Sequence, residues 1–530
     1  MTGASARVLQ PVSRPRYGST NLAGGAWGGG YEGAMRSRRL FGFRATEQSI
    51  NSLLAFSGAT LRARARWLSR NNPYAKKAKT EFVSNLVCTG IKPISKIDPD
   101  ESPGVKESVH RAWEDWTDEC DADGLTDFYG LQDLIGGALF DAGECFIRYR
   151  DRRAADGLSV PLQLQLLESE FCPLELNFTT GSGNLVKMGI EFDAVGRRVA
   201  YWMWRTHPGD IAIPVNQVGY TRIPAEEIVH VFEPTRPGQI RGESWLVAAM
   251  VKSYLLDQYD DAELARKQTA AYFAAFITKA GNDDQSPIGA QEQPALGSTD
   301  TSFNAPGEVN AGITPGTLQV LEPGEDIKFS APADVGPNFE AFEYRALLAM
   351  CAGMGLPYFA VTGDLKQANY GSLRAGMLGM RRSIERIQHK VMVYQLCRNV
   401  WARWLPTAVL AKAVSITAAQ FNASPIDWLR AKWTPPRWDW IDPSKDVKAE
   451  VEAIRGGLTT RSMSAAARGI DVEELDADMA ADNARADALG LVLDSDPRRT
   501  NLRGSAPPPD TTPPASPDEE TVDTAEEEAA

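Results

Sequence analysis

The chain has 530 residues, of which 43% are hydrophobic and 24% are charged, values typical of a soluble globular protein. This composition excludes collagen, a coiled-coil rod and wholesale disorder, and the length suits about three to five domains. The charge is uneven, because residues 1–80 carry 14 Lys and Arg against two acids, whereas residues 504–530 carry eight acids and no base. A basic beginning, an acidic body and an acidic end suggest three different electrostatic roles.

The first 242 residues predict an arm followed by an α+β block. Residues 1–35 are rich in Gly, Ser and Arg, a composition typical of a flexible arm. Amphipathic patterns after the arm predict helices over residues 44–72 (one or two helices), 74–87, 105–119 and 128–142. Strand patterns follow at residues 91–97, 146–152, 162–167, 185–192, 199–205 and 227–232.

The pattern changes after residue 243. Ser244 predicts the cap of a long helix, Trp245–Lys279, and Asn338 predicts the cap of a second helix, Phe339–Met354. Residues 281–317 between them are rich in Gly, Pro, Gln and Ser, so they predict a long loop. Later in the same interval, Pro323-Gly324 lies between two short apolar runs and predicts a hairpin of residues 318–321 with 327–330.

The C-terminal third predicts more helices and then a tail. A polar loop ends near Gly371, and a third long helix is expected over Ser372–Leu405, ending before Pro406. Shorter helices are expected at residues 442–455 and 472–489. From residue 505 on, six prolines and eight acids predict a disordered tail.

No catalytic or nucleotide-binding motif is present in the sequence. It contains no P-loop pattern, no His-Glu-x-x-His and no Gly-x-Ser-x-Gly. Gly28-x-Gly30-x-x-Gly33 matches the letters of a dinucleotide fingerprint, but no strand pattern precedes it. We therefore predict no cofactor and no enzymatic activity.

The residues that could bind a metal do not form a convincing set. Glu119-x-Asp121-x-Asp123-Gly124 resembles the start of a calcium loop, but the twelfth position is Gly130 instead of the required Glu. The four histidines lie far apart, and the six cysteines form no Cys-x-x-Cys pair. These patterns predict an acidic turn, structural histidines and reduced cysteines, with no metal site. No apolar run reaches the 18–20 or so residues of a membrane span, and no signal peptide is expected.

Several segments, taken in order, resemble one protein family. They are NNPYAKKA at 71–78, NLVCTGIKP at 85–93, GECF at 143–146, RPGQIRGESWL at 236–246, NYGSLR at 369–374 and DPSKD at 442–446. Together they resemble the portal proteins of tailed phages, lambda family, over roughly residues 36–490. The resemblance implies a mostly helical portal fold with β-strands in the wing, and a ring oligomer, usually of twelve subunits, through which double-stranded DNA passes.

The resemblance also implies a division of the chain into the parts of a portal. The expected parts are a basic arm (1–35), the wing (36–242), a stem helix (243–280), the clip (281–337), a second stem helix (338–355), a tunnel loop (356–371), a return to the wing (372–441), crown helices (442–494) and an acidic tail (495–530).

Candidate DNA-contacting residues are implied by this division. Lys366, Gln367, Asn369 and Tyr370 in the tunnel loop have the polar or basic character that transient phosphate contacts need. On the stem helix, Arg266 and Lys267 either line the channel or pair between subunits, and the sequence leaves both open.

The implied partners are other copies of the chain, double-stranded DNA, the terminase large subunit, the major capsid protein and scaffold, and a head–tail adaptor. No membrane partner is implied, and the expected location is the portal vertex of the virion, with the host cytoplasm during assembly. Two other interpretations remain: a virion shell or neck adaptor protein without catalysis, or a nuclease or peptidase with an unrecognised site.

Overall fold

The computed structural model describes ten stretches of the chain. They are residues 42, 47–97, 103–211, 219–272, 276–279, 325–328, 338–366, 369–436, 443–467 and 472–491. The chain divides into two compact units, Met1–Ser49 and Ile50–Ala530. The predicted arm and tail lie outside the described residues, and so does most of the predicted clip.

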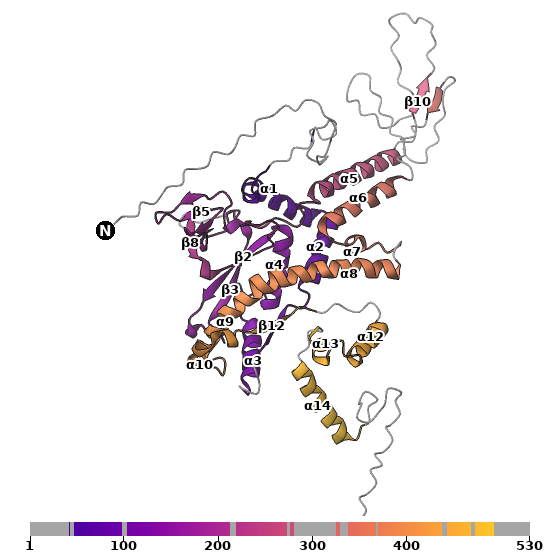
Figure 1. Cartoon of the computed structure of the whole chain (residues 1–530). Coiled ribbons are helices and arrows are strands. Elements are labelled where there is room, and N and C mark those ends of the chain that lie inside the picture. Colours follow the sequence, from indigo (N-terminus) through magenta and orange to yellow (C-terminus); the bar gives the residue numbers. More distant parts are fainter. Residues whose placement is uncertain are drawn as a thin grey trace, which may run out of the picture. The chain divides into compact units, whose positions relative to one another are not determined.

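Four helices form the first part of the second unit (Figure 1). They are α1 (Ile50–Asn71), α2 (Pro73–Leu86), α3 (Val105–Thr117) and α4 (Phe128–Asp141). Asn72 separates the first two: its side chain accepts from the amide of Ala75 at 2.9 Å, and Pro73 occupies the first position of α2, where no amide hydrogen is needed. The predictions of α2, α3 and α4 are confirmed to within two residues at each end, whereas α1 begins six residues later than the predicted start at residue 44.

Two antiparallel sheets come next in the chain. The first has the order β3-β2-β9, and the second has the order β4-β5-β6-β7-β8. Their strands are β2 (Glu144–Asp151), β3 (Leu162–Leu167), β9 (Ile228–Phe232), β4 (Phe178–Thr179), β5 (Leu185–Lys187), β6 (Ile190–Phe192), β7 (Arg198–Trp204) and β8 (Tyr220–Pro224). The predicted single strand 185–192 is wrong: Met188 and Gly189 both have positive φ and turn the chain, so it forms two paired strands.

Tryptophans fill the centre of the main core. Trp113 of α3 lies with its ring centroid 4.9–6.3 Å from those of Trp116, Trp401, Trp404 and Trp433. Because the last three of these residues are about 300 positions from Trp113 in the sequence, the cluster joins α3 to the C-terminal part of the unit. All six cysteines are free, as predicted.

The long helix predicted for Trp245–Lys279 is wrong at both ends. Residues 245–249 form turns, and helix α5 spans Met250–Tyr272. Residues 276–279 form strand β10 (Phe276–Lys279), which pairs antiparallel with β11 (Glu325–Lys328). The hairpin predicted around Pro323-Gly324 therefore has a different partner for its second strand, about 50 residues back along the chain. Helix α6 (Asn338–Met354) agrees with the prediction and lies beside α5 (Figure 1).

The predicted loop 356–371 contains a short helix, α7 (Tyr358–Thr362), which the sequence did not indicate. Helix α8 (Tyr370–Ile387) then continues through a π-helical stretch, Gln388–Cys397, into α9 (Arg398–Ala411). Pro406 lies inside α9, so the predicted helix end before this proline is wrong. The buried contacts of Trp401, Trp404 and Ala408 stabilise the helix on both sides of it.

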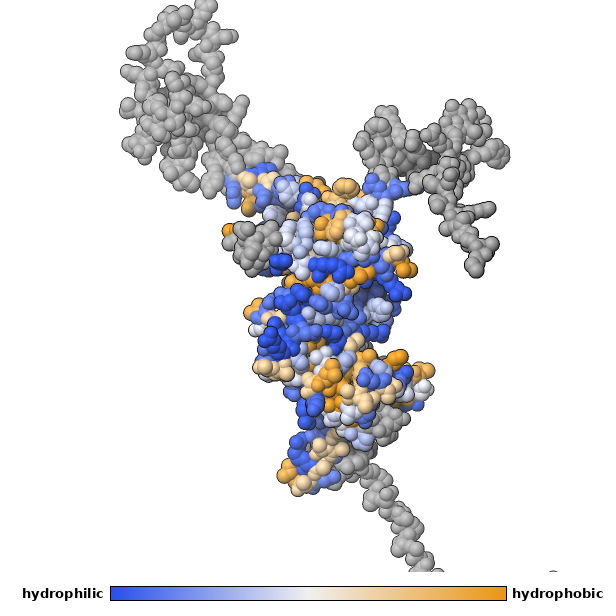
Figure 2. Space-filling model, turned by 90° about the vertical axis from the view of Figure 1, so that its left-hand side faces the viewer, coloured by the Kyte–Doolittle hydropathy of each residue, from blue (hydrophilic) through white to orange (hydrophobic). Residues whose placement is uncertain are grey.

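Smaller elements complete the second unit. Strand β12 (Ala431–Thr434) pairs with β1 (Lys92–Ser95), which brings residues more than 300 positions apart together. The remaining helices are α10 (Ala418–Ala423), α11 (Pro425–Trp428), α12 (Pro443–Arg455), α13 (Arg461–Ala467) and α14 (Val472–Leu489). Figure 2 shows hydrophilic residues interrupted by scattered apolar patches on one face of the molecule. Among the described residues, no helix is long and apolar enough to cross a membrane.

Candidate functional site

The two predicted stem helices, α5 and α6, contact each other through aromatic rings. The ring of Tyr259 lies 5.9 Å from that of Phe339 and 5.2 Å from that of Phe342. The ammonium of Lys267 lies 5.1 Å from the ring centroid of Phe339, a cation–π contact. Aromatic contacts thus hold the two helices together where they run side by side.

Arg266 and Lys267 both reach the same buried carboxylate. Arg266 donates two hydrogen bonds to Glu263, at 2.6 and 2.9 Å, and the ammonium of Lys267 lies 3.8 Å from it. Glu263 is only 7% exposed, so both cations compensate a desolvated charge of their own helix. This pairing within one subunit is a third arrangement, which neither of the two sequence-based alternatives included.

The base of α5 and α6 is joined to α2 through a cluster that we call the helix junction, formed by Asn72, Tyr74, Asp257, Asp260 and Glu343. Asn72 donates to Asp257 at 3.2 Å, and the hydroxyl of Tyr74 donates to Glu343 at 3.3 Å. The sequence NNPY therefore has a second role besides starting α2, because its second Asn and its Tyr donate to carboxylates of α5 and α6.

Asp260 is the least compensated group of the helix junction. Burial, and then the negative charges of Glu343, Asp257 and Asp261, raise the pKa of Asp260 to about 6. Burial and the same Glu343 also raise the pKa of Tyr74 to about 12. This excess of negative charge makes the junction sensitive to pH and to nearby cations.

The predicted tunnel loop is ordered mainly by its own side chains. Gly363 ends α7 in the left-handed conformation, and Asp364 accepts from the amide of Lys366 at 2.9 Å. Asn369 accepts from the amide of Ser372 at 2.8 Å, which makes it the N-cap of α8. Lys366 and Asn369 are both exposed, whereas Gln367 lies outside the described residues. Tyr370 is the first residue of α8.

A buried ion pair connects the two sheets; we call it the sheet junction, formed by Glu144, Ser169, His230, Arg241 and Gly242. Arg241 donates to Glu144 at 2.6 and 3.0 Å, and Glu144 also accepts from Ser169 at 2.5 Å and from the amide of Gly242 at 2.7 Å. Neither charged side chain is more than 2% exposed. Arg241 further donates to the carbonyls of Met188 and Cys172, in the segments around the second sheet.

The protonation states at the sheet junction are set by these bonds. Burial alone would raise the pKa of Glu144, but the charge of Arg241 and the hydrogen bonds from His230 and Arg241 hold it well below its usual range. Burial lowers the pKa of His230 to about 4 against the opposing pull of Glu144. Arg198 can only donate, so Nδ1 of His230 accepts and its Nε2 carries the hydrogen directed at Glu144, 3.1 Å away.

Two glycines allow the sheet junction to close. A Cβ at Gly143 would lie 2.1 Å from the backbone of Glu243, and one at Gly242 would lie 2.2 Å from the carbonyl oxygen of Gly143. The two backbones therefore touch, which accounts for a glycine in each of the segments GECF and RGES. The segments GECF and RGES therefore serve to hold the fold together. No local pattern in the sequence indicated that these two segments meet.

The calcium-like segment and a second acidic cluster are satisfied by other groups of the protein. Asp121 accepts from the amides of Asp123, Leu125 and Thr126, so the calcium-like segment is a hydrogen-bonded turn. Glu168, Glu170 and His207 lie close enough together to hold a cation. However, Arg66 pairs with both glutamates, and Arg62 pairs with Glu170. Two guanidinium groups thus already neutralise this cluster.

Comparison with known proteins decides the family. The sequence model described as "Phage portal protein, lambda family" matches residues 36–388, about two thirds of the chain. The chain belongs to the lambda family of phage portal proteins. The family is structural, and portal proteins act as oligomeric assemblies in the virion.

Individual portal proteins are similar over most of their length. The probable portal protein of Halomonas phage phiHAP-1 is 27% identical, over 82% of this chain and 81% of that protein. Portal protein B of Escherichia phage lambda is 24% identical, over 88% of this chain and 90% of that protein. Among solved structures, a chain from the neck of an empty gene transfer agent particle is 16% identical and covers 78% of this chain and 94% of that chain, with a TM-score of 0.43.

With the portal family established, the sequence-based site residues fall into two groups. Lys366 and Asn369 lie in the loop before α8 and Tyr370 is the first residue of that helix, and Asn369 is engaged as the helix cap. Arg266 and Lys267 are engaged by Glu263. The residues that the sequence missed are those of the two junctions, since the contacts of Asn72, Tyr74, His230 and Arg241 there reach residues 86 to 269 positions away.

Proposed function

We propose that about twelve copies of this chain close a ring at one vertex of a phage capsid, and that double-stranded DNA passes along the axis of this ring during packaging and ejection. The observation that carries the proposal is the match of residues 36–388 to the lambda family of portal proteins. Assembly takes place in the host cytoplasm, and the chain itself performs no catalysis.

Each part of the chain has a place in this role. The wing comprises residues 36–242 and 372–441, and the stem comprises α5 and α6. The clip is the segment between these helices, and it contains the paired strands β10 and β11. The crown comprises residues 442–494. The terminase large subunit docks on the clip and supplies ATP hydrolysis, and a head–tail adaptor later replaces it there. The major capsid protein and the scaffold contact the wing.

The electrostatics of the stem support passage instead of tight binding. Double-stranded DNA carries one negative charge per ~1.7 Å of axis, so a strongly basic channel would hold it by counterion release. In the stem, Arg266 and Lys267 are compensated by Glu263, and the helix junction carries excess negative charge. Lys366, with Gln367, Asn369 and Tyr370, provides a small number of contacts to phosphate that form and break as DNA moves.

Electron microscopy of the purified full-length chain tests this proposal. End-on class averages should show a ring of about twelve subunits with an axial hole, alone or after mixing with the capsid and scaffold proteins. Closed dimers or tetramers without a channel under both conditions would contradict the proposal.

A further inference from the structure

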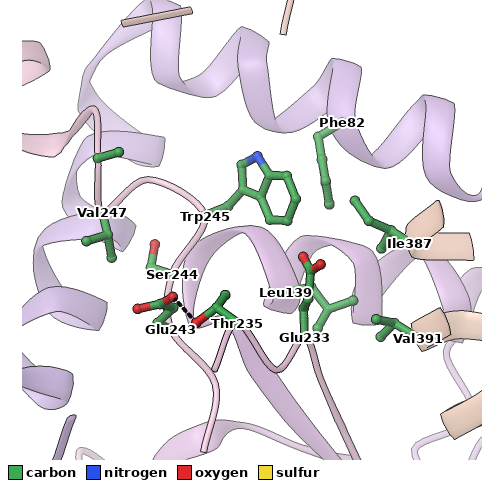
Figure 3. A pocket seen from close by; sticks show the side chains of 12 residues that line it. Phe82, Leu139, Glu233, Thr235, Glu243, Ser244, Trp245, Val247, Ile387 and Val391 are labelled. Atoms are coloured by element: carbon green, nitrogen blue, oxygen red, sulfur yellow. Dashed lines mark hydrogen bonds between the residues drawn. The ribbon is translucent and has the colours of Figure 1, made fainter. Parts of the chain in front are cut away.

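A cavity of about 230 Å³ opens beside the start of the stem, next to the residues that link β9 to α5 (Figure 3). Its apolar wall includes Phe82, Leu139, Trp245, Ile387 and Val391. Small-molecule sites measure roughly 300–1,000 Å³, so this cavity has the size for one large apolar side chain and not for a cofactor. We call it the Trp245 pocket.

Hydrogen bonds fix the position of Trp245 in the wall of the pocket. The indole of Trp245 donates to the carbonyl oxygen of Met354 at 2.6 Å, and its amide donates to the carbonyl oxygen of Phe140 at 3.0 Å. Ser244 donates to the same carbonyl oxygen of Phe140 at 3.2 Å. A pocket whose walls are fixed in this way binds a matching side chain with little loss of conformational entropy.

Two carboxylates lie among the residues that line the pocket, Glu233 and Glu243. Glu233 is neutralised by Arg386 and Lys390. Glu243 accepts a hydrogen bond from Thr235 at 2.8 Å but has no ion pair within the described residues. An apolar side chain with a cation beside it therefore fits the pocket in both shape and charge.

The same chain displays such a group elsewhere. On α8, Arg374, Leu378 and Arg382 follow at intervals of four residues, which places them on one face of the helix. Leu378 is 43% exposed, both arginines are exposed, and Arg382 has no ion pair within the part of the chain that the structure describes. We call these three residues the α8 ridge; it spans about 12 Å along the helix.

We propose that the Trp245 pocket of one subunit receives Leu378 of a second copy of this chain, with Arg382 of that copy beside Glu243. The contact joins two different surfaces, so repeating it generates a ring if the rotation closes. This inference rests on the proposed ring and names the surfaces that close it. It assigns a role to the exposed apolar residue of α8 and to the uncompensated carboxylate of the pocket.

Disulfide trapping tests the contact directly. Val247, which lines the pocket, and Leu378 are each replaced by Cys in a Cys88→Ser background, since Cys88 is the exposed native cysteine. Mild oxidation of assembled rings should give a ladder of linked subunits in denaturing electrophoresis. The matched control combines Val247→Cys with Leu410→Cys, which is 75% exposed on α9 and should give no ladder. Rings that form but give no more ladder than this control overturn the proposal.

A charge swap provides the second test. Glu243→Arg and Arg382→Glu should each raise the subunit concentration needed for half-assembly by about tenfold, and the double variant should recover most of this loss. Glu114→Arg, a charge reversal at an exposed position of α3, serves as the control and should assemble normally. A double variant no better than the single variants overturns the contact while the ring itself survives. Failure of the native chain to form rings with its capsid and scaffold partners overturns the proposed function as well.

Discussion

The sheet junction contains a fully buried carboxylate and the helix junction a half-buried one, and the protein compensates their charges differently. Glu144 in the sheet junction accepts from a buried arginine, a histidine, a serine and a backbone amide. Asp260 in the helix junction faces other carboxylates, and one of its oxygens is buried without a hydrogen bond in the described structure. A fully compensated charge fixes the two sheets in one arrangement, whereas an excess of like charge weakens the attachment of α5 and α6 to α2.

The largest loss of unfolding free energy is expected when the cation of the sheet junction is removed. Arg241→Met leaves Glu144 buried without its main partner, and such a loss costs about 3–5 kcal/mol. Urea unfolding followed by tryptophan fluorescence measures this free energy. Arg430→Met, which removes an exposed pair with Asp427, should cost less than about 1 kcal/mol in the same assay. Equal losses in the two variants would contradict the role of the sheet junction.

The close approach of the two backbones can be separated from the cost of positive φ. Gly143 and Gly157 have φ of 81° and 80°, but only Gly143 has atoms where a Cβ would lie. Alanine at either position carries the left-handed cost of about 1–2 kcal/mol. Gly143→Ala should carry a further 1–3 kcal/mol or so from overpacking. If thermal unfolding shifts equally in both variants, the contact between the two backbones is not tight.

The two junctions should respond to acid in opposite directions. His230 has a folded pKa of about 4 against an ordinary value of 6.5, so the unfolded state binds the proton first as the pH falls. Its contribution to stability is therefore lost between about pH 6.5 and 4. His230→Gln should flatten this part of the curve of unfolding free energy against pH. An unchanged slope would show that His230 does not control the acid response.

Asp260 should act in the other direction. Its folded pKa of about 6 lies above the ordinary 3.8, so the folded state binds the proton first and gains stability as the pH falls from about 6 to 4. Asp260→Asn removes the repulsion and should stabilise the protein at pH 7.5 by less than about 1 kcal/mol, since solvent screens this partly exposed group. The gain should vanish near pH 4. A gain that does not depend on pH would exclude charge repulsion as its cause.

The smallest effect on stability is expected in the loop before α8. Lys366 is exposed and its amide, not its ammonium, makes the contact to Asp364, so Lys366→Ala should change the unfolding free energy by no more than about 0.5 kcal/mol. Rings should still form, while packaging or retention of DNA decreases. Loss of assembly would show instead that the loop is structural. Asp364→Ala, which removes the acceptor that orders the loop, serves as the comparison.

Local sequence signals predicted much of the fold. The helices predicted at 74–87 and 128–142 are found as α2 and α4, whose first turns are capped by the side chains of Asn72 and Asp127, and the strand β3 has the bounds that its pattern predicts. The helix α14 likewise begins and ends where expected. These elements can be predicted from the sequence because the interactions that start or end them involve residues only a few positions apart.

Elements that depend on distant contacts were missed or misplaced. Residues 276–279 read as the end of a helix, but they pair with residues 325–328 as a strand. Pro406 reads as a helix end, but tertiary burial of its neighbours carries α9 past it. In both cases tertiary packing outweighed the local conformational propensity of the residues, which contributes only about 3 kcal/mol at most.

The candidate site divides in the same way. The loop holding Lys366 and Asn369 could be located from the sequence, because polar residues and glycine interrupt two helical patterns there. The pairing of Arg266 with Glu263 could also have been found, since they are three positions apart on one helix. Neither junction could have been found from the sequence, because the sequence does not say which distant carboxylate a given arginine or asparagine will contact.

Local patterns in the amino-acid sequence were thus sufficient to predict most of the longer helices, the strands β1, β2, β3, β7 and β9, and the resemblance to portal proteins. Three features became visible only in the folded chain: Arg241 neutralises Glu144, Asn72 and Tyr74 donate to carboxylates of α5 and α6, and a pocket forms at Trp245. The physical reason is that helix caps and turns depend on neighbouring residues, whereas buried charges and cavities depend on chain segments that only folding brings together.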